Sequence, residues 1–234
     1  MTKTVLVTGG NKGIGYEIAK RLLQEGYRVL VGARDQLRGE KAVAELQAWG
    51  DAQLVLLDVA NLQSIEHAVR IVTDQYSELS LLVNNAGIPG DMHKVGWEFD
   101  VEELRATYDV NFIGPFALTK GLLPLLIANH GKIQNVTIPI EPLTHFNAFA
   151  YATSKAPLNV MTKSWGMSFE QEQLPVQILA VLPGAVSTDL NGNMTGDFVK
   201  MPAEAAEFIV SFLIDDKNHN GQIINYDGTP IVYG

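Results

Sequence analysis

Seven short apolar segments recur along the chain, and longer stretches of mixed polarity separate them. Most segments are continuously apolar rather than alternating, which is typical of strands buried on both faces of a sheet. No internal repeat, low-complexity tract or linker interrupts this alternation. The pattern therefore predicts one α/β domain over residues 1–234, with helices on both faces of a doubly wound parallel sheet. The seven expected strands are 4–7, 28–31, 53–57, 80–83, 132–136, 177–182 and 221–225.

The stretches between the strands carry helical spacing and helix-start signals. Ile18 and Leu22 belong to an apolar stripe after the first strand. Asp100 followed by Glu103 is a capping box that predicts a helix start near residue 101. Pro202 suits the first turn of a last helix, expected to end at residue 214. Ligands of such sheets bind beyond the carboxyl ends of the strands, so functional residues are expected directly after strands.

Composition narrows the class of protein. The 234 residues include no cysteine, which excludes disulfides, thiolate metal sites and a cysteine nucleophile. No His, Asp and Glu set has the spacing of a metal site, so no metal is expected. No uninterrupted apolar run approaches the ~20 residues of a membrane span, and the N-terminus reaches glycines too soon for a signal peptide. These features predict a cytoplasmic protein.

Charge is unevenly distributed along the sequence. The net charge of −9 argues against general nucleic-acid binding. The first 50 residues nevertheless hold eight Lys and Arg against five Asp and Glu. This basic first fifth is either an uneven solvated surface or a place for a small anionic ligand.

A glycine-rich turn with the sequence TGGNKGIG, at residues 8–15, joins the first strand to the first helix. Glycine permits a tight turn and lets the backbone approach a pyrophosphate, and the helix N-terminus presents free N–H groups to the phosphates. The alternative is a turn with a structural role only. The position of the glycine-rich turn between the first strand and the first helix favours dinucleotide binding.

The end of the second strand indicates which dinucleotide binds. Enzymes that use the unphosphorylated cofactor usually have an acid there for the ribose 2′-hydroxyl, but this chain has Ala33 followed by Arg34. Lys12 of the glycine turn can point at the same spot. Two cations suit a 2′-phosphate, so the sequence predicts NADP(H) rather than NAD(H). Asp35 is expected to be a solvated turn residue or a helix cap.

Further polar residues follow the third and fourth strands. Asp58 is placed to accept a bond from an adenine amine, with Val59 supplying backbone groups; alternatively, Asp58 caps the helix that starts near residue 62. Asn85 is expected to hold the sheet edge or the neighbouring loop. Ala86 and Gly87 leave space for the cofactor.

Tyr151 and Lys155 are four residues apart in a helical segment after the fifth strand, so both project from one helix face. That spacing is common by chance. With T-G-x-x-x-G-I-G at 8–15, N-N-A-G at 84–87 and P-G at 183–184, in that order, it makes the chain resemble the short-chain dehydrogenase/reductase family over essentially its whole length. Within that family of Rossmann-fold oxidoreductases, the glycine turn with Arg34 is most similar to the NADPH-dependent carbonyl reductases.

The resemblance implies a mechanism. Tyr151 would donate a proton to a carbonyl oxygen as hydride arrives from the nicotinamide, or remove it in the oxidative direction. Lys155 would bond the nicotinamide ribose and, with the oxidised nicotinamide ring, favour the phenolate by roughly 3–4 kcal/mol. Asn111 matches the helix asparagine that anchors a water relaying protons to the lysine; alternatively, it is a polar residue that kinks a buried helix.

The resemblance also assigns the carboxamide of the nicotinamide to the segment after the sixth strand. Val186 would bind it through backbone groups and Thr188 through its hydroxyl. The full set of residues expected to bind NADP(H) is Gly9, Asn11, Lys12, Gly13, Ile14, Gly15, Arg34, Asp58, Val59, Asn85, Ala86, Gly87, Tyr151, Lys155, Pro183, Gly184, Val186 and Thr188.

One position departs from the family pattern. The family usually has a serine about thirteen residues before the tyrosine, and it bonds the substrate carbonyl oxygen; here that position is Ile138, which cannot donate. Thr137 is a possible catalytic stand-in, although adjacent strand residues point to opposite faces and a shift of the strand end would be needed. Thr144 or Asn147 of the following loop could substitute instead. The third alternative is a site with no substitute donor.

The loops after the fourth to sixth strands would enclose the substrate. Their mostly apolar residues favour a hydrophobic ketone or aldehyde over a phosphorylated or carrier-bound substrate. Residues 187–201 resemble a mobile lid. The pocket residues expected from this pattern are Ile138, Pro139, His145, Phe146, Leu190 and Met194. A lone loop histidine such as His145 is, however, more often a surface residue.

Two functions follow from these observations. The first is an NADPH-dependent oxidoreductase that reduces a small apolar ketone or aldehyde. The second is a non-catalytic or weakly active NADP(H)-binding sensor or scaffold, which Ile138 supports. No nucleic acid or membrane partner is expected. The family resemblance implies a homodimer or homotetramer paired through the helices around 101–128 and 152–172.

Overall fold

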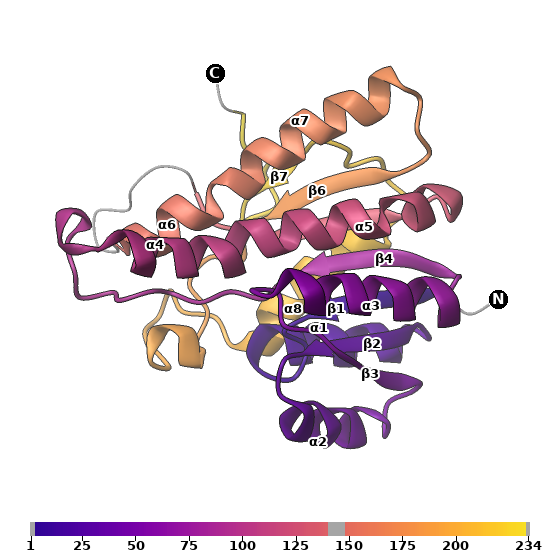
Figure 1. Ribbon diagram of the computed structural model, residues 1–234, viewed down its shortest axis with the longest axis horizontal. Coiled ribbons are helices and arrows are strands. Elements are labelled where there is room, and N and C mark those ends of the chain that lie inside the picture. The colour runs from indigo at the N-terminus through magenta and orange to yellow at the C-terminus, as the bar shows by residue number, and fades with distance from the viewer. Residues whose placement is uncertain (1–2, 140–147, 233–234) are drawn as a thin grey trace.

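A seven-stranded, all-parallel sheet runs through the centre of the molecule in the order β3-β2-β1-β4-β5-β6-β7 (Figure 1). The computed structural model describes residues 3–139 and 148–232. Each expected strand is present, and the order reverses between β1 and β4, as in a doubly wound sheet. The strands are β1 Thr4–Thr8, β2 Arg28–Ala33, β3 Ala52–Leu56, β4 Leu79–Asn84, β5 Lys132–Val136, β6 Gln177–Val181 and β7 Ile223–Ile224.

Helices cover both faces of this sheet. On one face lie α1 Gly13–Gln24, α2 Gln36–Leu46 and α8 Pro202–Ile214; on the other lie α3 Leu62–Gln75, α5 Gly114–Ala128 and α7 Pro157–Gln171. The remaining α-helices of the described residues are α4 Val101–Tyr108 and α6 Phe149–Lys155. The helix expected over 152–172 is therefore divided at Ala156, next to Pro157.

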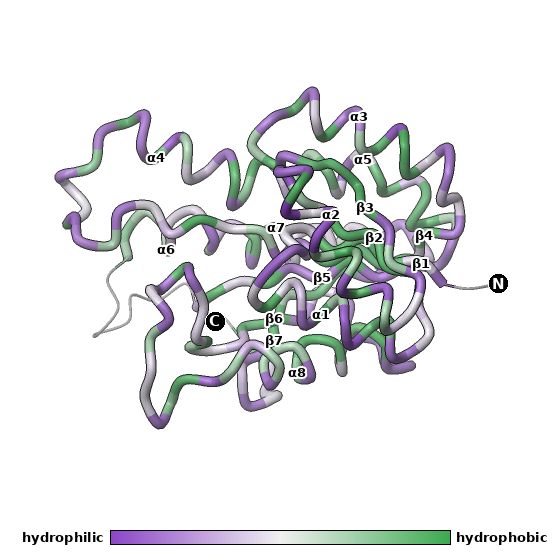
Figure 2. The backbone as a smooth tube through the Cα atoms, turned by 90° about the horizontal axis from the view of Figure 1, so that it is seen from below, coloured by the Kyte–Doolittle hydropathy of each residue, from purple (hydrophilic) through white to green (hydrophobic). Residues whose placement is uncertain are grey.

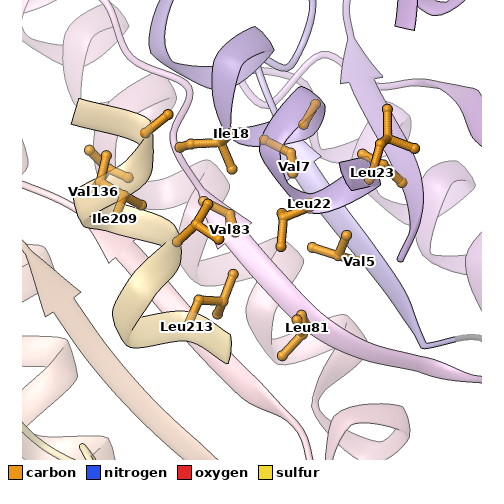
Figure 3. Close-up of a cluster of buried hydrophobic side chains, with 14 of the residues drawn as sticks. Val5, Val7, Ile18, Leu22, Leu23, Leu81, Val83, Val136, Ile209 and Leu213 are labelled. Carbon is orange, nitrogen blue, oxygen red and sulfur yellow. The ribbon is translucent and has the colours of Figure 1, made fainter. Parts of the chain in front are cut away.

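The continuous apolar pattern of the strands is explained by these two layers. In β1, Val5 and Val7 pack against α1 and α8 (Figure 3), whereas Leu6 between them packs on the opposite face. All three side chains are fully buried. Figure 2 shows the same arrangement, with green strands running through the interior. Because both faces exclude water, consecutive positions such as residues 5–7 are apolar rather than every second one.

The helix starts follow the expected signals. Asp100 accepts a hydrogen bond from the backbone N–H of Glu103 at 2.9 Å, and the Glu103 carboxylate accepts one from the N–H of Asp100. This capping box confirms the predicted start of α4. Pro202 opens α8 as expected. Asn61 caps α3 through the N–H groups of residues 63 and 64, so the alternative cap assigned to Asp58 was wrong.

The helix that contains α4 and α5 is interrupted by a π-helical turn, Asp109–Ile113. By length and composition alone, the whole helix Val101–Ala128 could cross a membrane. Polar residues interrupt it, so no continuous apolar run marks it in the sequence. Leu118, Leu122 and Leu126 of α5 are fully buried in the core beneath the sheet. We therefore describe it as a core helix, whose π turn brings one residue, Asn111, to the candidate site.

Candidate functional site

A large cavity lies along the carboxyl ends of the strands. Its volume is about 1870 Å³, larger than the ~300–1,000 Å³ of an ordinary small-ligand pocket, so it has room for a dinucleotide and a second molecule. Loops after β1 to β6 line it, which is where the sequence placed the functional residues. Among the expected residues in the described segments, Gly15 and Asn111 are not part of its wall.

The glycine turn forms the cradle at one end of the cavity. Gly9 and Gly13 have φ values of +65° and +55°, which favour glycine. A Cβ on Gly15 would overlap the carbonyl oxygen of Gly9 and the side-chain amide of Asn85. No side chain caps the first N–H groups of α1, so they are available to an anion. Gly15 thus acts by packing, while its neighbours line the cavity.

The two cations expected at the ribose differ in their surroundings. Arg34 is exposed at the cavity wall, and no ion pair or hydrogen bond of its guanidinium is found with the described residues. Lys12 is held by Asp189, with 2.9 Å between Nζ and Oδ2. This ammonium holds the pKa of the Asp189 carboxyl below its ordinary value. Asp35 accepts a hydrogen bond from the N–H of Arg38, which confirms it as the cap of α2.

The ends of β3 and β4 supply the next part of the wall. Asp58 and Val59 line the cavity, and the Asp58 carboxylate accepts a hydrogen bond from the Ala60 N–H at 3.0 Å. Its role toward adenine stays a prediction. Asn85 donates to the carbonyl oxygen of Thr8 at 2.9 Å, so it joins the end of β4 to the end of β1 as expected.

Lys155 is buried at the centre of the site, with 2 % of its surface exposed. Its Nζ donates to the carbonyl oxygens of Ala86 and Val136, each at 3.1 Å. A Cβ on Gly87 would lie 3.1 Å from the Lys155 Cε and 3.2 Å from the Asn111 Oδ1, so an added side chain would have to displace these buried groups by a few tenths of an ångström. Burial disfavours the charged amine and lowers the pKa of Lys155 to about 8.

Tyr151 lies one turn earlier, on α6, and lines the same cavity. Burial disfavours the phenolate and raises the pKa of Tyr151 to about 12. The family resemblance implied a site that lowers this pKa. In the protein alone, desolvation acts in the opposite direction, and the neighbouring Lys155 is itself driven toward its neutral form. The resting phenol therefore keeps its proton at neutral pH.

Asn111 joins the π turn to two other parts of the site. Its side chain accepts a hydrogen bond from the Ile88 N–H at 2.9 Å and donates to the Ile88 carbonyl oxygen at 2.9 Å and to Ser154 Oγ at 2.8 Å. It is fully buried. These bonds favour the interpretation of a polar residue in a distorted helix, while its role as a water anchor stays a prediction. Ser154, next to Lys155, was not singled out in the sequence.

The end of β5 is fastened to the helix that carries Lys155. The Thr137 hydroxyl donates to the carbonyl oxygen of Lys155 at 3.1 Å, so its proton is used inside the protein. Asn159 donates to the carbonyl oxygen of Ile138 at 2.9 Å and is 1 % exposed. Thr137 therefore lies toward the helix backbone, which does not favour it as the substitute donor. Asn159 was missed, although Tyr151, Lys155 and Asn159 share four-residue spacing.

The segment after β6 closes the site. Ser187 donates its backbone N–H to the carbonyl oxygen of Lys200 at 2.9 Å, and Val186 and Lys200 form a bridge at the base of the 187–201 loop. A Cβ on Gly13 would lie 3.6 Å from Thr188 Cγ2, so the start of the 187–201 loop lies next to the glycine turn. Asp189, which pairs with Lys12, was not singled out in the sequence.

The expected substrate wall is partly described. Lining residues include Ile138, Pro139, Leu190 and Met194, together with Phe149 and Phe198. His145, Phe146, Thr144 and Asn147 lie outside the described residues. Within residues 3–139 and 148–232, no group of three His, Cys, Asp or Glu could hold a metal ion.

The buried Lys155 predicts a pH-dependent contribution to stability. Its pKa is about 8 in the folded protein, whereas the ordinary pKa of a lysine is 10.5, so between these pH values the unfolded chain binds more protons. Stability must then rise with pH in this window. Relative to Lys155→Met, we expect the wild-type free energy of unfolding to increase by about 3 kcal/mol from pH 7 to pH 10.5.

Denaturant unfolding at several pH values measures this difference. Lys120→Met, which removes an exposed lysine of α5, tests whether the loss of a positive charge alone has the same effect. Parallel curves for the wild type and Lys155→Met would contradict the prediction.

Comparison with known proteins agrees with this geometry. Residues 3–197 match the family model described as short chain dehydrogenase. The chain is 30% identical to a 3-oxoacyl-[acyl-carrier-protein] reductase of Synechocystis, over 99% of this chain and 98% of that protein. The fold is shared with an NADPH-bound carbonyl reductase from chicken fatty liver, with a TM-score of 0.87, 24% identity and 99% of each chain covered.

A second solved structure has slightly higher identity. It is an alcohol dehydrogenase from the archaeon Thermococcus sibiricus complexed with 5-hydroxy-NADP, with a TM-score of 0.85, 25% identity, and 100% of this chain and 98% of that chain covered. The family match spans most of the sequence and includes the glycine turn, Tyr151 and Lys155. The chain therefore belongs to the short-chain dehydrogenase/reductase family and has its Rossmann-like fold.

Proposed function

We propose that this protein reduces small apolar ketones or aldehydes to alcohols with NADPH. The observation that carries the proposal is the placement of Tyr151 and Lys155 on one wall of the cavity, with Lys155 held by two backbone carbonyls. The wall residues Ile138, Leu190 and Met194 offer an apolar surface to the substrate. The cytoplasmic location and the homodimer or homotetramer expected from the sequence stay predictions.

The nicotinamide, when bound, supplies the hydride. Tyr151 then provides the proton that the carbonyl oxygen gains. Its raised pKa means that the phenol is protonated at neutral pH, which is the state a proton donor needs. An ammonium has three donors, and Lys155 directs two of them to Ala86 and Val136. The third is left for the ribose or the phenol oxygen, where a positive charge would ease the loss of the proton.

Desolvation of Tyr151 disfavours the phenolate, which reduction leaves behind and from which oxidation starts, so the raised pKa alone favours neither direction. A positive charge from Lys155, or from an oxidised nicotinamide when bound, would stabilise that phenolate.

The residues present fit a phosphorylated dinucleotide. The N-terminus of α1 is free of side-chain caps and lies in a glycine cradle, which suits a pyrophosphate. Arg34 is exposed beside the buried Ala33, and no described acid hydrogen-bonds to it. Arginine can bind a 2′-phosphate in bidentate fashion, while the usual ribose-binding acid is absent from position 33. The solved relative with 5-hydroxy-NADP supports the same choice.

Oxidation of NADPH in the presence of a panel of ketones and aldehydes tests the reaction itself. We expect turnover with apolar carbonyl compounds and a loss of at least 100-fold in kcat for Tyr151→Phe, because the ring remains while the proton donor is removed. NADPH binding without turnover, unchanged by Tyr151→Phe, would favour the non-catalytic sensor or scaffold.

The cofactor choice is tested by kcat/KM with NADPH and NADH. Arg34→Ala should lower kcat/KM for NADPH by tenfold or more, since a charge-assisted bond to phosphate is worth about 1.5–3 kcal/mol, and should change the value for NADH little. Arg38→Ala, which removes an exposed arginine outside the cavity wall, is the matched control. A wild-type preference for NADH would refute the assignment.

The residue at position 138 determines whether a side chain donates a hydrogen bond to the substrate carbonyl oxygen. Since Thr137 donates to Lys155, we expect that the described wall lacks a replacement for the usual serine. Ile138→Ser should then raise kcat at least tenfold, because an added oxyanion donor can be worth ~2.7–4 kcal/mol. Ile138→Ala separates the hydroxyl from the loss of bulk. An equal gain in both variants, or no gain, would show that the serine hydroxyl is not what the site lacks.

A further inference from the structure

The ion pair between Lys12 and Asp189 spans the dinucleotide cleft. Lys12 belongs to the glycine turn after β1, and Asp189 to the short 3-10 helix Asp189–Asn191 after β6. In the sheet, β4 and β5 lie between these two strands. Both side chains line the cavity and are about two-thirds exposed, at 62% and 65%. The pair therefore joins two walls of the same site across its mouth.

Asp189 is presented by a segment that holds itself together. The Asn191 side chain accepts a hydrogen bond from the Thr188 N–H at 3.1 Å and donates to the Val186 carbonyl oxygen at 2.9 Å. The Asn193 N–H donates to the Thr188 carbonyl oxygen at 2.8 Å. None of these three backbone-anchoring bonds uses the Asp189 carboxylate, whose partner besides Lys12 is the side-chain amide of Asn193. The charge of Asp189 can therefore be removed while the backbone of the segment keeps its own bonds.

The two cations of the ribose end are consequently unequal. Arg34 makes no ion pair with the described residues, whereas the charge of Lys12 is already matched by Asp189 at 2.9 Å. A lysine has one ammonium on a flexible stem, so turning it toward a phosphate would give up the carboxylate. Arg34 can meet a phosphate without such an exchange.

We propose that Asp189 is a specificity-determining residue whose carboxylate competes with the 2′-phosphate of the cofactor for Lys12. This inference rests on the proposed use of NADP(H). A phosphorylated ligand must draw Lys12 away from Asp189, while an unphosphorylated one leaves the pair in place. Asp189 therefore reduces the preference for the phosphorylated cofactor below what Lys12 and Arg34 together would give.

Calorimetric binding of 2′,5′-ADP and 5′-AMP to the full chain tests the competition, because these nucleotides differ only in the 2′-phosphate. In Asp189→Asn, the Kd of 2′,5′-ADP should fall two- to fivefold, a modest factor because exposed ion pairs are weak. The Kd of 5′-AMP should stay unchanged. In a Lys12→Gln background, the same substitution should produce no gain selective for 2′,5′-ADP.

Asp197→Asn is the matched control, because Asp197 is an exposed aspartate of the same loop with no hydrogen bond or ion pair to the described residues. Equal tightening of both nucleotides, or the same gain in Asp197→Asn, would indicate a general charge effect and overturn the inference. An unchanged Kd for 2′,5′-ADP in Asp189→Asn would also overturn it.

The same data distinguish this inference from the proposed cofactor. If the wild type binds both nucleotides equally and Asp189→Asn acquires a preference for 2′,5′-ADP, the competition stands and the assignment of NADP(H) falls. If neither protein shows a preference, both fall.

Discussion

The burial of one amine organises the site. Lys155 gives up most of its hydration, and the carbonyl oxygens of Ala86 and Val136 replace part of it. One carbonyl lies just after the end of β4 and the other at the end of β5. The two neighbouring strands must therefore end at nearly the same level of the sheet. A side chain at Gly87 would crowd Lys155, and the Thr137 hydroxyl donates to the carbonyl oxygen of Lys155. Several neighbouring residues thus serve to hold the buried lysine in place.

The contacts that hold Lys155 also explain why the fold tolerates an isoleucine at position 138. The end of β5 is held by backbone and helix contacts, namely Val136 to Lys155, Thr137 to Lys155 and Ile138 to Asn159. None of these contacts uses the side chain of residue 138. The side chain at position 138 can therefore be replaced without loosening the end of β5. The residue expected to contact the substrate is thus independent of the contacts that hold the strand.

The sequence predicted the sheet better than the contacts across it. Apolar segments and caps such as Asp100 are local signals, and all seven strands formed where they were expected. The last strand was overestimated, since β7 is an edge strand of only two residues beside Gly221. The pair of Lys12 and Asp189 joins residues 177 positions apart, and no local pattern reports it. The π turn around Asn111 was equally hidden, because its residues have no distinctive composition.

That π turn also affects how the two halves of one helix are oriented. A π turn carries one residue more than the regular helix allows, and each residue of an α-helix rotates the chain by about 100°. The apolar stripe of α5 is therefore out of phase with that of α4, and the two segments can face different neighbours: α5 packs on α3 and β4, and α4 on α6. Because of this one added residue, α5 packs in the core while α4 packs against α6 near the site.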